Sequence, residues 1–445
     1  MVHERESLSP LKSFLFPHIF RSFRMAIQPS RLTIAFAALL VICLAGWIMD
    51  LSQTVVVFAQ DQVALPGGIA GRRPQGGITE LNAYLRSPAQ FRSLVDSPPS
   101  SHTKTGVFNA LGGFADAELQ TVTTALLSLD IRQFVRSLVN SIQRSAQAVI
   151  WAFTYHTLYS LIFFAVALVV LSAAGGAICR LTALQFASGT HQGLPNACRF
   201  ARKRLASLVA APVGPLVIAF LLGLPILLLG VIGNIPVAGE LLAGLLLPLA
   251  LLLAPFIAVI LIGEAAGLGL MFPAVAYEDS DFFDAVGRSF SSVYAKPWRL
   301  GFYTLLATVY GAVCHLFVRL FAWVLLWVTG WFLQLGLSDA KSRAIWPGAH
   351  PADVIGTVGA PQAWSLCAGA FLVRMWTFAI TGLTVAFLIS FYFTANTVIY
   401  ALMRRHVDGT ELEEVYEVAD EDSRQEAGRV GMASASPEPA DATSE

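Results

Sequence analysis

Six apolar segments, each close to or above the length needed to cross a bilayer, constrain this sequence more than any other feature. A membrane-spanning helix needs about 20 consecutive, mostly apolar residues. The segments cover residues 32–51, 149–179, 208–233, 237–262, 300–335 and 366–403. The composition agrees, because only 13% of the residues are charged, against about 25% in soluble domains. The sequence therefore predicts an all-α, polytopic transmembrane helical bundle with about six spans.

The first apolar segment has a second interpretation, which is a cleaved signal peptide. Val57 and Ala59 offer the small residues of a cleavage site. Against this, residues 1–31 form a long leader before the apolar run, and Asp50 closes that run. We expect a retained span, with cleavage as the alternative.

Lysine and arginine are concentrated in the connections on one side of the predicted bundle. They occur before the first span, after the second and fourth spans, and after the sixth span at Arg404 and Arg405. Cytoplasmic loops carry an excess of these residues, so six spans put both termini in the cytoplasm, with the protein in the plasma (inner) membrane.

The resulting organisation has five parts. They are a basic cytoplasmic N-terminus at 1–31, a first transmembrane helix at 32–51, an extracytoplasmic segment at 52–148, a five-span membrane domain at 149–403 and an acidic cytoplasmic tail at 404–445. The tail is rich in Ala, Ser, Pro and Glu, so we expect it to be largely disordered.

The fifth apolar segment is predicted to be one long helix, because only Gly311 punctuates its middle. Trp323, Trp327 and Trp331 recur every four residues and share one face of this helix. Such a stripe is either an interfacial belt or a packing surface against the sixth span.

The segment 52–148 begins with Pro- and Gly-rich sequence that predicts irregular structure, and its pattern becomes helical from about Glu118. The apolar face of this helix comprises Leu126, Leu129, Phe134, Leu138 and Ile142. Arg132, Arg136 and Arg144 lie opposite. We expect an amphipathic helix on the outer membrane surface, or packed against projecting outer ends of the fifth and sixth spans.

Two cytoplasmic connections, 181–207 and 273–299, share one pattern. Each has a short apolar segment, a polar turn and a small amphipathic helix before the next span. Pro195 suits the first position of its helix. Asp284 suits a first turn and is spaced i,i+4 from Arg288. The pattern predicts two cytoplasmic elbow helices and an internal pseudo-repeat.

Three short series in the second connection resemble a signature of uncharacterised bacterial multi-spanning membrane protein families. The series run from Pro273 to Glu278, from Asp284 to Phe290 and from Lys296 to Arg299. They are also similar, more distantly, to the membrane domain attached to some glycerophosphodiester phosphodiesterases. The resemblance implies a fold and a bacterial inner-membrane location but no activity, since the catalytic part of those phosphodiesterases has no counterpart here.

The sequence contains no recognisable catalytic motif, dinucleotide fingerprint or metal-ligand spacing. We therefore expect a non-enzymatic protein without cofactors, and its net charge of +0 gives no reason to expect a nucleic-acid partner. The candidate structural polar residues are Glu264, Glu278, Asp284, Arg288, Arg319 and Arg374.

Some of these residues have specific expected roles. Glu264 is expected near one end of the fourth span. Arg319 and Arg374 are expected near the outer ends of the fifth and sixth spans, where they would anchor the segment 52–148 through Asp116, Glu118 or Asp130. His156 and His315 fall in predicted spans, where a lone histidine more often joins two helices by a hydrogen bond than binds a ligand.

Two functions fit these observations. The first is a non-enzymatic scaffold that binds membrane lipids, or a protein partner through its acidic tail. The second is a permease for a neutral or lipid-like solute, whose third and fourth spans, rich in Gly and Pro, are broken around a site. A polar cavity between the third, fourth and sixth spans would favour the permease, and a sealed apolar interior would favour the scaffold.

Overall fold

The computed structural model describes residues 16–58, 78–86, 91, 102–128, 130–190, 192–338, 341, 346 and 364–410. In this part of the chain six helices are long and apolar enough to cross a membrane. They are α2 (Pro29–Met49), α7 (Thr157–Ala187), α9 (Leu205–Ile232), α10 (Ala238–Glu278), α12 (Pro297–Gly336) and α14 (Trp364–Val407). The predicted all-α polytopic bundle is confirmed. The expectations for residues 1–15 and for the tail after Thr410 lie outside the described residues.

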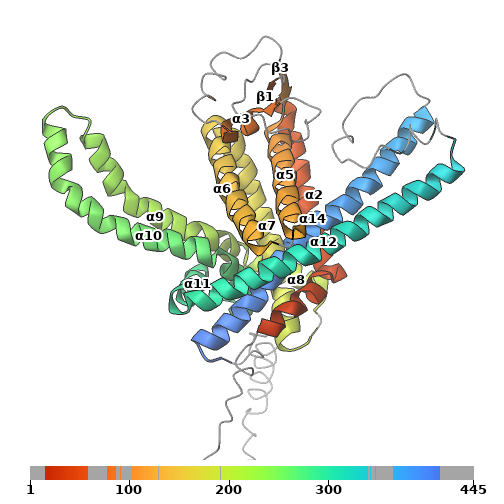
Figure 1. Cartoon of the computed structure of the whole chain (residues 1–445). Helices are drawn as coiled ribbons and strands as arrows, with labels where there is room; N and C mark the ends of the chain where they lie inside the picture. The colour runs from red at the N-terminus through yellow and green to blue at the C-terminus, as the bar shows by residue number, and fades with distance from the viewer. Residues whose placement is uncertain are drawn as a thin grey trace, which may run out of the picture.

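The helices form a central group and two diverging arms (Figure 1). One arm is the hairpin of α9 and α10, and the other is formed by α12 and α14. Between the arms stand α2, α7, α5 (Val107–Leu127) and α6 (Ile131–Tyr155). The arms and the central group meet only at the base, so the main core lies there.

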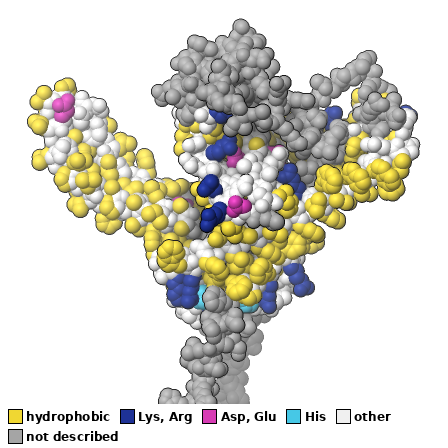
Figure 2. Space-filling model, viewed as in Figure 1, with side chains coloured by type: hydrophobic (Ala, Val, Ile, Leu, Met, Phe, Trp, Pro, Cys, Tyr) yellow, Lys and Arg dark blue, Asp and Glu magenta, His cyan; other side chains and the backbone are white. Residues whose placement is uncertain are grey.

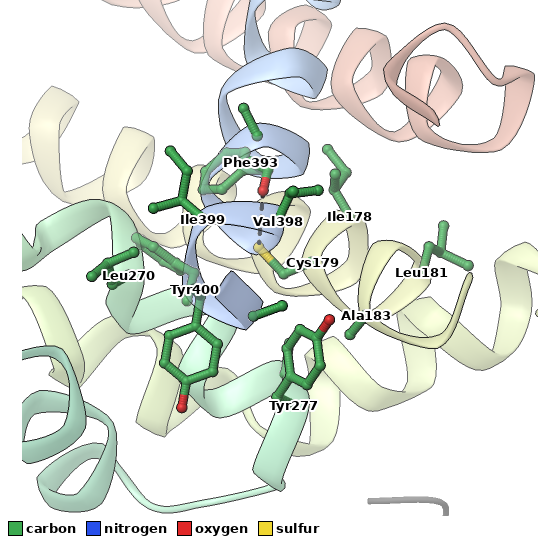
Figure 3. Close-up of a cluster of buried hydrophobic side chains, with 14 of the residues drawn as sticks. Ile178, Cys179, Leu181, Ala183, Leu270, Tyr277, Phe393, Val398, Ile399 and Tyr400 are labelled. Carbon is green, nitrogen blue, oxygen red and sulfur yellow. Dashed lines mark hydrogen bonds between the residues drawn. The ribbon is translucent and has the colours of Figure 1, made fainter. Parts of the chain in front are cut away.

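The main core joins the ends of α7, α10 and α14 (Figure 3). Cys179, Tyr277 and Tyr400 are almost fully buried in it. The rings of Tyr277 and Tyr400 pack with their centroids 5.6 Å apart. Gly175 allows the Phe393 ring to approach α7 so closely that a Cβ atom would collide with it. This interior is packed like that of a soluble protein.

The helix boundaries differ most from the prediction in α7 and α10. Helix α7 begins at Thr157, because His156 leaves the helical region at φ −129 and ψ 50. Residues 149–155 belong to α6, and His156 lies between two helices instead of within a span. Helix α10 continues to Glu278. Glu264 was predicted near the end of this span, and it lies instead well inside the helix.

The fifth span is a single helix, α12, that passes His315 and Arg319 without a break, as predicted. Its three tryptophans, Trp323, Trp327 and Trp331, are 54%, 57% and 50% exposed. The stripe therefore does not pack against the sixth span, and the first two indole rings stack on one another with centroids 6.2 Å apart. Side chains that are about half exposed fit an interfacial belt better than a packing surface, and the belt stays a prediction.

The segment 52–148 contains a three-stranded antiparallel sheet that the sequence did not predict. Its strands lie in the order β2 (Ile78–Thr79), β1 (Val55–Phe58) and β3 (His102–Thr105). Val57 pairs with Thr79 on one side, and Val56 pairs with Lys104 on the other. Strands of two to four residues are too short to show a clear alternating pattern. Together with α3 (Glu80–Arg86), they build a small second core around Trp151 and Phe91.

The predicted amphipathic helix is a hairpin of two helices, α5 and α6. Helix α5 begins at Val107, well before Glu118, and its first turn is capped by Asp50. The Asp50 carboxylate follows the end of α2 and accepts the backbone N–H groups of Phe108 and Asn109 at 2.9 and 2.8 Å. Asp130 caps α6 by accepting the Arg132 N–H at 2.9 Å.

Helix α5 does not lie against the outer ends of the fifth and sixth spans, which was one of the two positions that we expected. Its C-terminal half, at 119–126, lies beside residues 304–315 of α12 and 388–399 of α14. These stretches are in the halves of α12 and α14 that are remote from Gly336 and Trp364. The hairpin thus runs lengthwise among the long helices (Figure 1).

The two elbow helices are present as α8 (Leu194–Lys203) and α11 (Phe282–Ala295). Each folds back along the helix that precedes it. The Arg180 guanidinium of α7 lies 5.0 Å from the Phe200 ring centroid of α8. The Ser289 hydroxyl of α11 donates to the Gly267 carbonyl of α10 at 2.6 Å. The order of long helix, turn, short helix and long helix therefore occurs twice. The short N-terminal pieces η2 (Phe16–Phe20) and α1 (Arg21–Ala26), and η3 (Asp50–Ser52) after α2, complete the described elements.

Candidate functional site

Two of the predicted polar residues, Glu278 and Arg288, meet at the base of the molecule. Glu278 is the last residue of α10, and one of its carboxylate oxygens pairs with the Arg288 guanidinium. The other oxygen accepts the Tyr400 hydroxyl at 2.8 Å and lies 3.6 Å from Arg404. Both oxygens are therefore occupied, which fits a structural clamp better than a general acid or base.

The predicted pair between Asp284 and Arg288 is not formed. Asp284 is exposed, and Arg288 reaches Glu278 and, at 3.9 Å, Asp408. The reason is that the fold brings the end of α10 and the end of α14 to the same side of α11. A partly buried carboxylate attracts the guanidinium more strongly than a solvated one on the helix surface.

Further contacts tie the elbows to the rest of the base. Arg204, between α8 and α9, pairs with Asp279 at 2.6 Å and with Asp281 at 3.4 Å. Lys296 donates to the carbonyl of His406, whose ring also contacts the Arg299 guanidinium at 2.9 Å. Each elbow is thus fixed by side chains from another helix or turn.

The other three candidates remain apart from this cluster. Glu264 is 7% exposed, and its Oε2 has no hydrogen-bond partner among the described residues. In the same part of the chain, Arg319 and Arg374 form no ion pair. The carboxylates expected to bind them have other partners: Glu118 pairs with Arg144 at 2.8 Å, Asp116 accepts from the Gln120 side chain, and Asp130 caps α6. The anchoring prediction is therefore not supported.

The chemically most suggestive site is an apolar cavity of about 380 Å³ between α5, α12 and α14. Helix α5 contributes Leu119, Val122, Thr123 and Leu126. The hydroxyl of Thr123 donates to its own helix, at the Leu119 carbonyl, and Thr308 on α12 does the same at Thr304. The lining is therefore mostly hydrocarbon. The hydroxyls of Thr123 and Thr308 already donate within their own helices, and the Asn396 amide donates to the Tyr392 carbonyl at 2.9 Å.

His315 is the exception in this lining. It is 3% exposed, and neither of its ring nitrogens has a hydrogen-bond partner among the described residues. A buried polar group without a partner is unfavourable by about 1–3 kcal/mol. The predicted role of this histidine, a hydrogen bond between two helices, is thus not seen. Its imidazole can instead donate to, or accept from, a group inside the cavity.

A second cavity, of about 410 Å³, follows the polar sides of α5 and α6. Arg136 and Asn140 line it, together with the Glu118–Arg144 ion pair. The Ser141 hydroxyl donates to the Glu118 carboxylate at 2.7 Å. This second cavity shares no lining residue with the apolar cavity, so the hairpin presents an apolar side to α12 and α14 and a separate polar side.

Burial shifts the pKa of two groups in the small second core. Burial raises the pKa of the Glu80 carboxyl, although the Val56 N–H bound to it at 3.1 Å acts in the opposite direction. Burial beside Trp151 lowers the pKa of His156 below its ordinary value of 6.5. Both groups lie in the small second core and are remote from the apolar cavity.

No local pattern in the sequence places residues 119–126 beside His315, so the cavity could not be predicted. The one available signal was a lone histidine within an apolar segment, for which the sequence predicted a hydrogen bond between helices and no ligand. Comparison of the chain with protein-family models, curated proteins and solved structures finds no match.

Proposed function

We propose that this integral membrane protein is non-enzymatic and binds a lipid or a similar amphiphile in the cavity between α5, α12 and α14. The apolar part of the ligand lies among the side chains of the three helices. A neutral hydroxyl or carbonyl group of the ligand forms a hydrogen bond with His315.

The observation that carries this proposal is the combination of an apolar lining with one buried, unpartnered imidazole. Ligand cavities are typically about 300–1,000 Å³, mostly apolar, with few polar groups that orient the ligand. A charged headgroup would be poorly solvated against this lining. The cavity therefore favours a neutral polar group attached to a hydrocarbon body.

The alternative of a permease has less support. It called for a polar cavity between α9, α10 and α14, whereas the described cavities lie elsewhere and the base between α7, α10 and α14 is closely packed (Figure 3). Helices α9 and α10 also continue through their prolines, including Pro215 and Pro255. Continuous helices favour ordinary kinks over a broken binding site.

The same proposal includes the location: a bacterial inner membrane, with both termini on the cytoplasmic side. Its support is that the first described segment lies beside the end of α14, since the charge of Arg405 acts on the His18 ring of η2. We also propose that the chain is related to the bacterial multi-spanning families that it resembles, and that its acidic tail binds a protein partner.

The test is whether filling the cavity excludes a lipid. Ala312 lines the cavity, whereas its neighbour Val313 is 50% exposed on the outer face of α12. The full chain and the variants A312F and V313F would be purified in mild detergent, and their bound lipids identified by mass spectrometry. We expect a defined neutral lipid in the unmodified chain and in V313F, and its loss in A312F. Equal lipid content in all three proteins would refute the proposal.

A further inference from the structure

Arg31 carries a buried positive charge that no carboxylate balances among the described residues. It is 1% exposed, in the first turn of α2. Its guanidinium donates to the Thr182 hydroxyl, to the carbonyls of Met25 and Leu181, and to the side-chain oxygens of Gln28 and Gln185, at 2.5–3.0 Å. These acceptors satisfy all five N–H groups, but they are neutral.

A cavity of about 530 Å³ adjoins this buried guanidinium. Arg21, Arg24, Gln28 and Gln185 line it. Because the two amide oxygens face Arg31, the NH₂ group of each amide is turned away from Arg31. The cavity thus brings two guanidinium groups and two amide donors close to a third, buried cation.

Two further features make the potential at this cavity positive. Helix α2 begins here, at Pro29 after Gln28, and a helix N-terminus carries a partial positive charge. The second feature is Arg405, whose positive charge, like that of Arg21, lowers the pKa of the nearby His18, although burial has the larger effect. A buried charge without a countercharge is unfavourable, so an anion in the cavity would stabilise the whole arrangement.

We infer that this cavity at the junction of α1, α2 and α7 binds a phosphate group. Arg21 and Arg24 bind the phosphate oxygens by charge-assisted hydrogen bonds, and the field of Arg31 and the α2 N-terminus adds to the attraction. The phosphate belongs either to the headgroup of an anionic lipid or to a free phosphate ion. The site is separate from the apolar cavity and does not depend on its function.

The test uses the full chain in detergent, supplied with equal amounts of phosphatidylglycerol and phosphatidylcholine and examined by native mass spectrometry. A second arm adds an excess of sodium phosphate. The double variant R21Q/R24Q removes two cavity charges. Its matched control, R199Q/R202Q, removes two exposed arginines of α8, and thermal unfolding checks that both variants are folded. The single variant R24Q serves if the double variant does not fold.

We expect the unmodified chain and R199Q/R202Q to retain phosphatidylglycerol selectively, and R21Q/R24Q to bind it about a hundredfold more weakly or worse, because two charge-assisted hydrogen bonds are lost. If sodium phosphate displaces the bound phosphatidylglycerol, the site binds free phosphate. If the phosphatidylglycerol is retained, the site binds a lipid headgroup. Equal losses in both double variants, or no selectivity in the unmodified chain, would overturn the inference.

Discussion

At the scale of single residues, position in the fold decides which charges matter. Glu278 and Asp284 are both carboxylates of the second elbow, six positions apart. The Glu278 side chain is 12% exposed and has three partners, Arg288, Arg404 and Tyr400. Asp284 is exposed and forms no ion pair within the described chain. Only the first residue can contribute much to stability.

We therefore expect E278Q to lower the free energy of unfolding by about 2 kcal/mol, because it removes the charged carboxylate that Arg288 and Arg404 share. The matched variant D284N should change it by less than about 0.5 kcal/mol. Unfolding of the purified protein in detergent measures both effects. Similar stabilities of the two variants would contradict the structural role of Glu278.

At the scale of elements, the second elbow is held by close contact between α10 and α11. A Cβ atom on Gly267 would collide with the Ser289 hydroxyl, and one on Gly263 would lie within about 3 Å of the Phe290 ring. Gly287, on α11 itself, has no atom within 4 Å of the corresponding position. Close packing therefore requires glycine at Gly267, whereas no neighbouring atom requires glycine at Gly287.

We expect G267A to destabilise the protein by about 1–3 kcal/mol, because the added methyl group forces α11 away from α10. In G287A the methyl group meets no neighbour, and the higher helix propensity of alanine should stabilise the protein by up to about 1 kcal/mol. Thermal unfolding in detergent compares the two variants. A stabilised G267A would show that α11 does not pack as described.

At the scale of the whole molecule, the two arms expose apolar surface along their length (Figure 2). On the arm of α9 and α10, Leu241 and Leu245 are 73% and 76% exposed. Apolar surface of this extent needs lipid around it. Lysine and arginine gather at the base and on the central part in the same view. This distribution agrees with a base at the cytoplasmic side.

The expected topology can be checked with reporter fusions. A fusion after Gly233, at the tip of the first arm, should report the outer side of the membrane. Fusions after Arg204 and after Arg405, both at the base, should report the cytoplasm, because the basic residues remain there. An external reporter after Arg405 would exclude six crossings with both termini inside.

The membrane class, the long helices and the elbows were set by the sequence alone, because apolar length and helical periodicity are local properties. The unbroken α12 and the short helices α8 and α11 were foreseen in this way. Helix ends were predicted less accurately. The backbone leaves the helical region at His156, so α7 begins at Thr157 and not at residue 149, and the continuation of α10 beyond residue 262 was not predicted.

The tertiary structure decided which distant segments meet. It placed α5 beside His315 and so created the apolar cavity, and it gave Arg288 the carboxylate of Glu278 in place of that of Asp284. It also surrounded Arg31 with neutral acceptors beside Arg21 and Arg24. Burial and pairing of this kind depend on contacts between residues far apart in the chain, and no local pattern of apolar and charged residues encodes them.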